Sequence, residues 1–334
     1  MLRFYKSNHP LVVVLVLLSI GLLHFYTFYL PVSAADEFVN PLSRALLWVL
    51  HFIPLNQTLL ENCLSILLLF VQALYFNSIL DKHKIVDRGN YLGAYIYVVL
   101  SCMFRNFLFL SPALIGNLFL LVEIDLLFSV FKKEKASSQI FDLGFFIAAS
   151  SLFYFPSLAF LLFLFIGMLI LRPLKIGEWF VLLIGVLVPY FLSAVYFFWY
   201  DRLPEFFSNI TFRRVMNEEF GFVTNLEVLV ISAIVLVALV WSVLKIQTHY
   251  FKTLVQIRNY FVVLLVFSLL GFPSVFLQSS IRIENFIWLV IPVATALTYS
   301  VPLLKKEWIA EIFHLTLLLL ILYFQFEKQL SLFE

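Results

Sequence analysis

The sequence predicts an all-α fold, a polytopic bundle of transmembrane helices. Of its 334 residues, 63% are apolar and 13% are charged, and the mean hydropathy is +1.02. A soluble domain of this length would not cover so much apolar surface, whereas a chain folded in a bilayer exposes it to lipid. Several apolar runs approach the length of about 20 residues that crosses a hydrocarbon core of about 30 Å.

Apolar runs near this length predict about eleven membrane helices, at 11–30, 58–80, 90–105, 111–131, 139–155, 157–172, 177–199, 226–247, 259–273, 285–304 and 308–326. The first run is longer than the apolar core of a secretory signal, so we expect an uncleaved helix there. No linker or tandem repeat divides the chain, which predicts a single polytopic membrane domain over residues 1–334.

Basic residues predict the orientation, because cytoplasmic loops of membrane proteins carry an excess of Lys and Arg. With the N-terminus in the cytoplasm, only seven of the 22 basic residues lie outside: Arg44, Arg105, Arg202, Arg213, Arg214, Arg282 and Lys328. Eleven crossings then place the C-terminus in the periplasm. We therefore expect a multi-pass protein of the cytoplasmic (inner) membrane.

An acidic pair, Asp36-Glu37, follows the first predicted helix at the expected outer border of the membrane. Charges are scarce in this chain, so two adjacent carboxylates at the water boundary are the best candidates for chemistry. A carboxylate acts as a general base when it can take the proton of a reacting hydroxyl group. We predict Asp36 and Glu37 as the catalytic residues.

The next segment, Pro41–Pro54, is predicted to be an amphipathic helix that lies along the outer interface. Its expected apolar face recurs at three- and four-residue steps, at Leu42, Ala45, Leu46, Val49 and Ile53. A second stripe contains Arg44, Trp48 and His51, and an Arg and a Trp at headgroup depth suit contact with a lipid phosphate. We predict Arg44 and His51 as phosphate-binding residues. An ordinary interfacial anchor is the other interpretation of this helix.

Four further arginines are candidates for binding a substrate or lipid phosphate: Arg105, Arg202, Arg213 and Arg214. Paired guanidinium groups can bind a phosphate or pyrophosphate through bidentate hydrogen bonds. The alternative for loop 200–225 is a solvated segment whose charges compensate one another. Arg105 lies at the outer end of its run and is expected to project toward that loop, or to have another partner there.

The remaining charged residues and the histidines within apolar runs are expected to have structural roles. Glu123 and Asp125 are expected to pair with the lysines of 132–135 at the cytoplasmic border, and His24 and His314 to be hydrogen-bonded structural residues. With only ten glycines, little close glycine-mediated helix packing is expected.

Sequence motifs for cofactors and nucleic acid are missing. No metal-ligand cluster, phosphate-binding glycine loop or catalytic triad occurs in the sequence, so no metal or other cofactor is predicted, with a divalent cation left open. The basic residues form no patch, which argues against a nucleic-acid partner.

The order of features resembles the GT-C superfamily of membrane glycosyltransferases. The corresponding residues are Asp36-Glu37, then Pro41–Pro54, then the short segments through Trp199, so the resemblance is one of architecture over about residues 1–200. It implies a polyprenyl-phosphate sugar donor, Asp36 as general base, Glu37 orienting or replacing it, and arginines that hold the phosphate. The Phe-rich composition also resembles that of polytopic membrane proteins of Bacteroidota.

Two functions fit these observations. The first is an enzyme that transfers a sugar from a polyprenyl-phosphate donor to a cell-envelope acceptor at the outer face. The second is a non-catalytic subunit of a cell-envelope complex, which binds a membrane protein partner or membrane lipids. Transport ranks below both, because the middle of most runs has few of the polar residues that transport requires.

Overall fold

The computed structural model describes residues 2–5, 7, 9–28, 38–86, 89–173, 175–210, 225–249, 253–277, 281–304 and 306–330. These residues are mostly helical, and no β-strand occurs among them. The predicted all-α class is therefore confirmed for the described part of the chain.

Seven helical stretches among the described residues are long and apolar enough to cross a membrane: α4 (Gln57–Lys82), α6 (Pro112–Ser129), α9 (Ile176–Trp199), α11 (Leu226–His249), α12 (Val255–Val275), η7 with α13 and η8 (Ile283–Leu303), and α14 (Glu307–Leu330). Four other apolar helices are shorter: α2 (Leu11–Leu23), α5 (Leu92–Ser101), α7 (Ser137–Phe153), and η4 with α8 (Phe155–Leu171). The protein is a multi-pass helical membrane protein. Length and composition support seven of the eleven predicted crossings.

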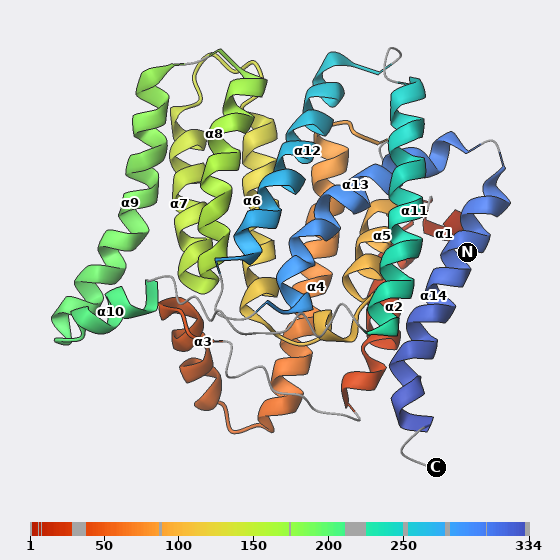
Figure 1. The fold of residues 1–334 in the computed structure, drawn as a ribbon, viewed down its shortest axis with the longest axis horizontal. Coiled ribbons are helices and arrows are strands. Elements are labelled where there is room, and N and C mark those ends of the chain that lie inside the picture. Colours follow the sequence, from red (N-terminus) through yellow and green to blue (C-terminus); the bar gives the residue numbers. More distant parts are fainter. Residues whose placement is uncertain are drawn as a thin grey trace.

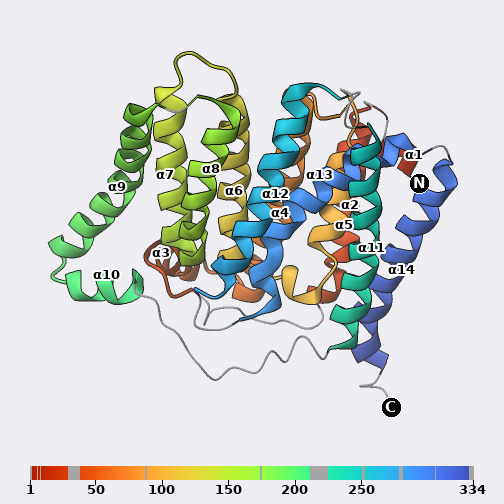
Figure 2. The ribbon, with the colours of Figure 1, turned by 45° about the horizontal axis from the view of Figure 1, so that its top comes forward.

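The helices run side by side between two ends of the bundle (Figures 1 and 2). At one end lie two short helices, α3 (Pro41–His51) and α10 (Leu203–Ile210). We call it the α3 end. The opposite end, where α4 and α6 finish and α9 begins, carries Lys82, Lys132 and Lys175, and we call it the lysine end.

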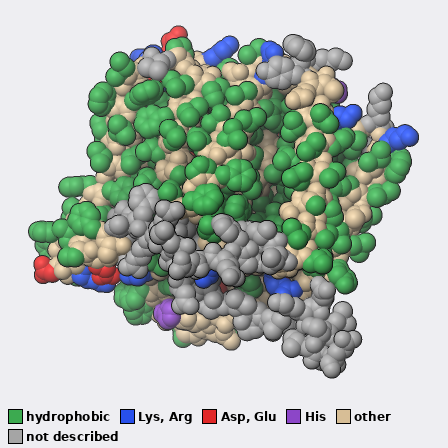
Figure 3. All heavy atoms as spheres, viewed as in Figure 1, with side chains coloured by type: hydrophobic (Ala, Val, Ile, Leu, Met, Phe, Trp, Pro, Cys, Tyr) green, Lys and Arg blue, Asp and Glu red, His purple; other side chains and the backbone are tan. Residues whose placement is uncertain are grey.

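Hydrophobic side chains cover most of the face drawn in Figure 3, and charged side chains gather near the two ends. In the most apolar 18-residue stretch of α9, and in that of α11, only 22% of the residues are buried, so most side chains of these helices face outward. An outward face of this kind is expected for helices that contact lipid.

Local capping signals explain several helix starts. The Ser111 hydroxyl accepts a hydrogen bond from the Leu114 amide at 3.1 Å, and Pro112 occupies the first turn of α6. The Asn56 side chain accepts a hydrogen bond from the Thr58 amide at 3.1 Å at the start of α4. Both helices begin within one residue of the predicted positions.

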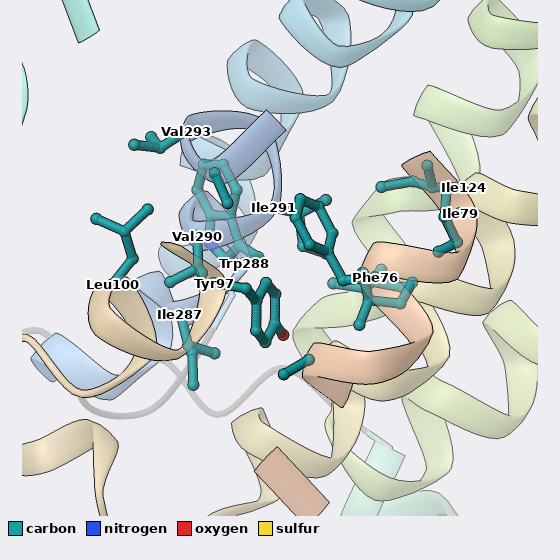
Figure 4. Packing of buried hydrophobic residues seen from close by; sticks show 14 of the residues in the cluster. Phe76, Ile79, Tyr97, Leu100, Ile124, Ile287, Trp288, Val290, Ile291 and Val293 are labelled. Carbon is teal, nitrogen blue, oxygen red and sulfur yellow. The ribbon is translucent and has the colours of Figure 1, made fainter. Parts of the chain in front are cut away.

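A cluster of aromatic rings surrounds Trp288 of η7, which is 2% exposed. The centroids of its ring and those of Phe160, Phe267 and Phe272 are 5.8, 5.9 and 5.5 Å apart, in edge-to-face arrangements. Figure 4 draws Trp288 and Tyr97 of α5 among the residues of one buried cluster.

Helices α7 and α9 pack closely through two glycines. A Cβ atom at Gly144 would overlap the carbonyl oxygen of Leu182, and one at Gly185 would overlap that of Phe141. The prediction of little glycine-mediated packing is therefore wrong for this pair. A few glycines suffice when they face each other across one interface.

Candidate functional site

Helix α3 packs against α7 and α4 at the α3 end, with one side toward the bundle. Leu46, Leu47 and Leu50 contact a small buried cluster that includes Phe38. The helix ends at His51, earlier than the predicted bound of Pro54.

The face of α3 that packs inward differs from the predicted one. Val49 is 52% exposed and Ile53 is 36% exposed, although both were assigned to the apolar face. The run from Ala45 to Leu50 is apolar at every position, so sequence periodicity does not determine which side faces the bundle. Trp48 is 66% exposed, as its position on the other stripe predicted.

Arg44 on α3 and Arg202, just before α10, converge on the carboxylate of Glu205. Arg44 Nη1 lies 3.2 Å from Glu205 Oε1, while Arg202 donates from Nε to Oε2 at 2.7 Å and from Nη2 to Oε1 at 2.9 Å. We call Arg44, Arg202 and Glu205 the α3–α10 cluster. Two predicted phosphate-binding arginines, far apart in the sequence, thus lie together at the α3 end.

The α3–α10 cluster is open to solvent and positively charged. The side chains of Arg44, Arg202 and Glu205 are 47, 60 and 31% exposed. Hydrogen bonds from Arg202 hold the pKa of Glu205 below its ordinary range, with a smaller effect from Arg44. Two guanidinium groups against one carboxylate leave an excess positive charge and further N–H donors, which suit a phosphate group.

Asp36, Glu37, Arg213 and Arg214 lie outside the described residues. The first described residue after the acidic pair, Phe38, is 5% exposed in the cluster under α3. Asn40, which follows, donates a hydrogen bond from Nδ2 to the Phe153 carbonyl at 3.1 Å. The chain that continues from the predicted catalytic residues is therefore attached to the α3 end.

Arg105 has partners in another part of the bundle. Its Nη2 atom donates to the carbonyl oxygens of Phe324 at 2.6 Å and Gln325 at 3.4 Å, near the end of α14. In both ribbon views α14 stands on the opposite side of the bundle from α3 and α10 (Figures 1 and 2). The structure does not bring Arg105 to the α3–α10 cluster.

His51 is exposed at the end of α3. Its Nδ1 atom lies 2.8 Å from the carbonyl oxygen of Leu47 in the same helix. A hydrogen bond of this kind positions the ring along α3. The contact of His51 with a lipid phosphate stays a prediction.

A second charged cluster lies between α4 and α6 at the lysine end. Asp125 is 2.8 Å from Lys82 Nζ, 2.7 Å from His83 Nε2 and 3.0 Å from the Tyr75 hydroxyl. We call these four residues the α4–α6 cluster. Asp125 pairs with α4 instead of the lysines of 132–135, because the end of α4 packs beside α6.

Three other expectations for buried polar groups have different outcomes. Glu123 is fully buried in α6, and its carboxyl oxygens have no hydrogen-bond partner in the described part of the chain, so its predicted lysine pairing is not observed. His24 Nδ1 lies 3.1 Å from the Ile20 carbonyl, and His314 Nε2 lies 2.8 Å from the Tyr95 hydroxyl. Both histidines are hydrogen-bonded within the bundle, as predicted.

The described residues hold no group of three or more His, Cys, Asp or Glu side chains placed to bind a metal ion. A further ion pair joins Arg172 Nη2 to Glu178 Oε1 at 2.8 Å, whereas the α3–α10 and α4–α6 clusters each bring three or more polar and charged side chains together. Of these, the α3–α10 cluster contains predicted site residues, and the α4–α6 cluster was missed because its pairing depends on how α4 and α6 meet.

The chain matches the model of a family described as a family of unknown function, DUF6427, over residues 37–333, and it belongs to that family. No curated protein and no solved structure matches the chain. The matched range contains Glu37 and the whole α3–α10 cluster.

Proposed function

We propose that this protein is a membrane glycosyltransferase, which moves a sugar from a polyprenyl-phosphate donor to a cell-envelope acceptor at the α3 end. In this proposal all eleven apolar helices cross the cytoplasmic membrane and the α3 end faces outward. The N-terminus then lies in the cytoplasm and the C-terminus outside. The excess of basic residues in the loops expected on the cytoplasmic side supports this orientation.

The observation that carries the proposal is the convergence of Arg44 and Arg202 on one carboxylate at the α3 end. A carboxylate and a phosphate use the same guanidinium donors, so a cluster that binds Glu205 also offers donors to a lipid phosphate. We assign Arg213 and Arg214, from the segment between α10 and α11, to the same phosphate site. His51 is placed on the same helix as Arg44 and is assigned a minor role there.

In the proposed reaction, the carboxylate of Asp36 accepts the proton of the acceptor hydroxyl group. The hydroxyl oxygen forms a bond to the anomeric carbon of the sugar, and the bond from that carbon to the phosphate oxygen breaks. The electron pair leaves with the polyprenyl phosphate, whose charge Arg44 and Arg202 stabilise. Glu37 orients Asp36 or replaces it as the base.

The test measures transfer of a radiolabelled sugar from lipid-linked donors to envelope acceptors in membranes from cells that carry each variant. Asp36→Asn is expected to lower the rate by about 10²–10⁴-fold, the usual cost of losing a general base. Glu37→Gln should have a smaller effect. All variants are compared at equal protein abundance, measured by immunoblotting.

The matched control is Asp201→Asn, which removes another exposed carboxylate at the α3 end. Asp201 has a φ angle of 54°, a conformation that Asn adopts more readily than most residues. Its transfer rate should equal that of the unmodified protein. Full transfer by an Asp36→Asn/Glu37→Gln double variant, or no transfer by the unmodified protein, would end the proposal.

A non-catalytic role in a cell-envelope complex is the second candidate. It is favoured by one observation: Arg44 and Arg202 already have a carboxylate partner within the chain, so the α3–α10 cluster is also suited to joining two helices. In that case the double variant supports normal envelope assembly. Arg44→Glu, which opposes Glu205, would then reduce the recovery of a co-purifying envelope protein.

A further inference from the structure

We propose that a cavity between α5, α11, α13 and α14 binds one acyl chain of an anionic phospholipid from the leaflet at the lysine end. This site is separate from the α3–α10 cluster and independent of the proposed transferase activity. The cavity has a volume of about 250 Å³. Its walls include Leu100 of α5, Trp241 of α11, Leu297 of α13 and Phe313 of α14.

The lining selects an apolar occupant. The polar exception, His314, has its Nε2 atom 2.8 Å from the Tyr95 hydroxyl, so the ring already has a hydrogen-bond partner. An apolar cavity of about 150 Å³ stays free of water and binds a molecule such as benzene. The larger cavity described here therefore has room for a segment of hydrocarbon chain.

The cavity opens sideways toward lipid. Val237 and Ile309 line it and are themselves 64 and 43% exposed, whereas Ala238 and Leu317 of the same two helices are buried. In the most apolar 18-residue stretches of α11 and α14, only 22% and 28% of the residues are buried. The cavity is thus continuous with the lipid-facing surface, where acyl chains are the abundant apolar groups.

A lysine lies toward the end of the cavity where a headgroup would be. Leu304, another lining residue, precedes α14, so the cavity extends to the lysine end. Lys245 is half-buried and follows Trp241 by four residues, on the same side of α11 and one turn nearer that end. A lysine in this position extends its amine to headgroup depth and favours an anionic lipid.

The test is native mass spectrometry of the full-length protein in detergent, with phosphatidylglycerol or phosphatidylcholine added. Ala238→Leu and Ala310→Leu each fill the cavity from a buried lining position. Each variant is expected to retain about one phosphatidylglycerol molecule fewer per protein molecule, since the cavity has room for a segment of one acyl chain. Ala194→Leu, on α9 and away from the cavity, is the control and should retain the lipid.

Lys245→Gln tests the headgroup contact and does not change the cavity wall. It should reduce the preference for phosphatidylglycerol over phosphatidylcholine by about fivefold, the effect of one lysine near an anionic membrane surface. The proposal is overturned if folded filling variants retain the same lipid, or if the unmodified protein binds both lipids equally. If neither filling variant folds, the Lys245→Gln result decides.

Discussion

The α3–α10 and α4–α6 clusters contain similar chemical groups in different surroundings. In each, one carboxylate accepts hydrogen bonds from two basic side chains. Glu205 is 31% exposed between arginines that are 47 and 60% exposed. Asp125 is 10% exposed and its partner His83 is 6% exposed, whereas its other partner, Lys82, is 52% exposed.

Burial changes the role that each cluster can have. The hydrogen bonds of exposed ion pairs are readily replaced by hydrogen bonds to water, and such pairs contribute about 0–1 kcal/mol to stability. Such pairs leave room for a ligand anion to bind the same cations. A buried carboxylate is shielded from such exchange, and removing it leaves a buried partner such as His83 without this hydrogen-bond acceptor. The comparison therefore favours the α3–α10 cluster as the ligand site of the proposed function, and it favours helix attachment for the α4–α6 cluster.

The largest expected effect on stability is that of Asp125→Ala. It removes the acceptor shared by Tyr75, Lys82 and His83, and should lower the free energy of unfolding by about 3 kcal/mol. Glu205→Ala, the exposed counterpart, should cost less than about 1 kcal/mol. Thermal unfolding in detergent measures both, and equal losses would contradict the distinction between the clusters.

A smaller effect is expected where neutral groups are packed closely. Gly144→Ala places a Cβ atom against the carbonyl oxygen of Leu182 and should destabilise the α7–α9 contact by about 1–3 kcal/mol. Gly21→Ala is the matched control, since a Cβ atom there meets nothing within 4 Å. A Gly144→Ala protein that unfolds at the same temperature as the Gly21→Ala protein would show that α7 and α9 separate easily.

The smallest expected effect is a pH dependence from the α3–α10 cluster. The folded-state pKa of Glu205 is lowered, chiefly by hydrogen bonds from Arg202. Its stabilising contribution is therefore fully present above the ordinary Glu pKa of about 4.3 and is lost as the pH falls through the lowered value. The unfolding temperature of the unmodified protein minus that of Glu205→Gln should be constant from neutral pH to about 5 and then decline. A difference that grows below that pH would reverse the assigned sign.

Long apolar runs allowed most of the fold to be predicted from the sequence. Each of the eleven predicted ranges overlaps a described helix, because burial in lipid requires apolar side chains along a whole helix. The sequence also predicted a helix at α3 but not its inward face, since every residue from Ala45 to Leu50 is apolar. Gly144 and Gly185 were missed because their contact depends on the register between α7 and α9.

The candidate site was only partly predictable for a similar reason. Arg44 and Arg202 were both predicted as phosphate ligands, but their common partner Glu205 lies 161 residues from Arg44. Such a contact is fixed by the position of α10 beside α3. Arg105 instead donates to backbone carbonyl groups of α14. Every residue carries a backbone carbonyl group, so the amino-acid sequence does not indicate which one accepts the hydrogen bond. Asp36 and Glu37 stay predictions, as they lie outside the described residues.

The central claim is that the exposed arginines of the α3–α10 cluster hold a lipid phosphate, with Glu205 as the group that a phosphate competes with. Arg44→Gln and Arg202→Gln each remove a donor, whereas Glu205→Gln keeps both arginines and removes the competing charge. Lys132→Gln, at the lysine end, is the control for a change in total charge.

Binding of polyprenyl phosphate to the purified full-length protein, measured by native mass spectrometry, tests this claim most directly. Each arginine variant should weaken binding about tenfold, corresponding to one lost charge-assisted hydrogen bond, and Glu205→Gln should strengthen it. The Lys132→Gln protein should bind like the unmodified protein. Equal affinity in all four variants, or weaker binding by Glu205→Gln, would contradict the claim and leave the cluster as a contact between α3 and α10.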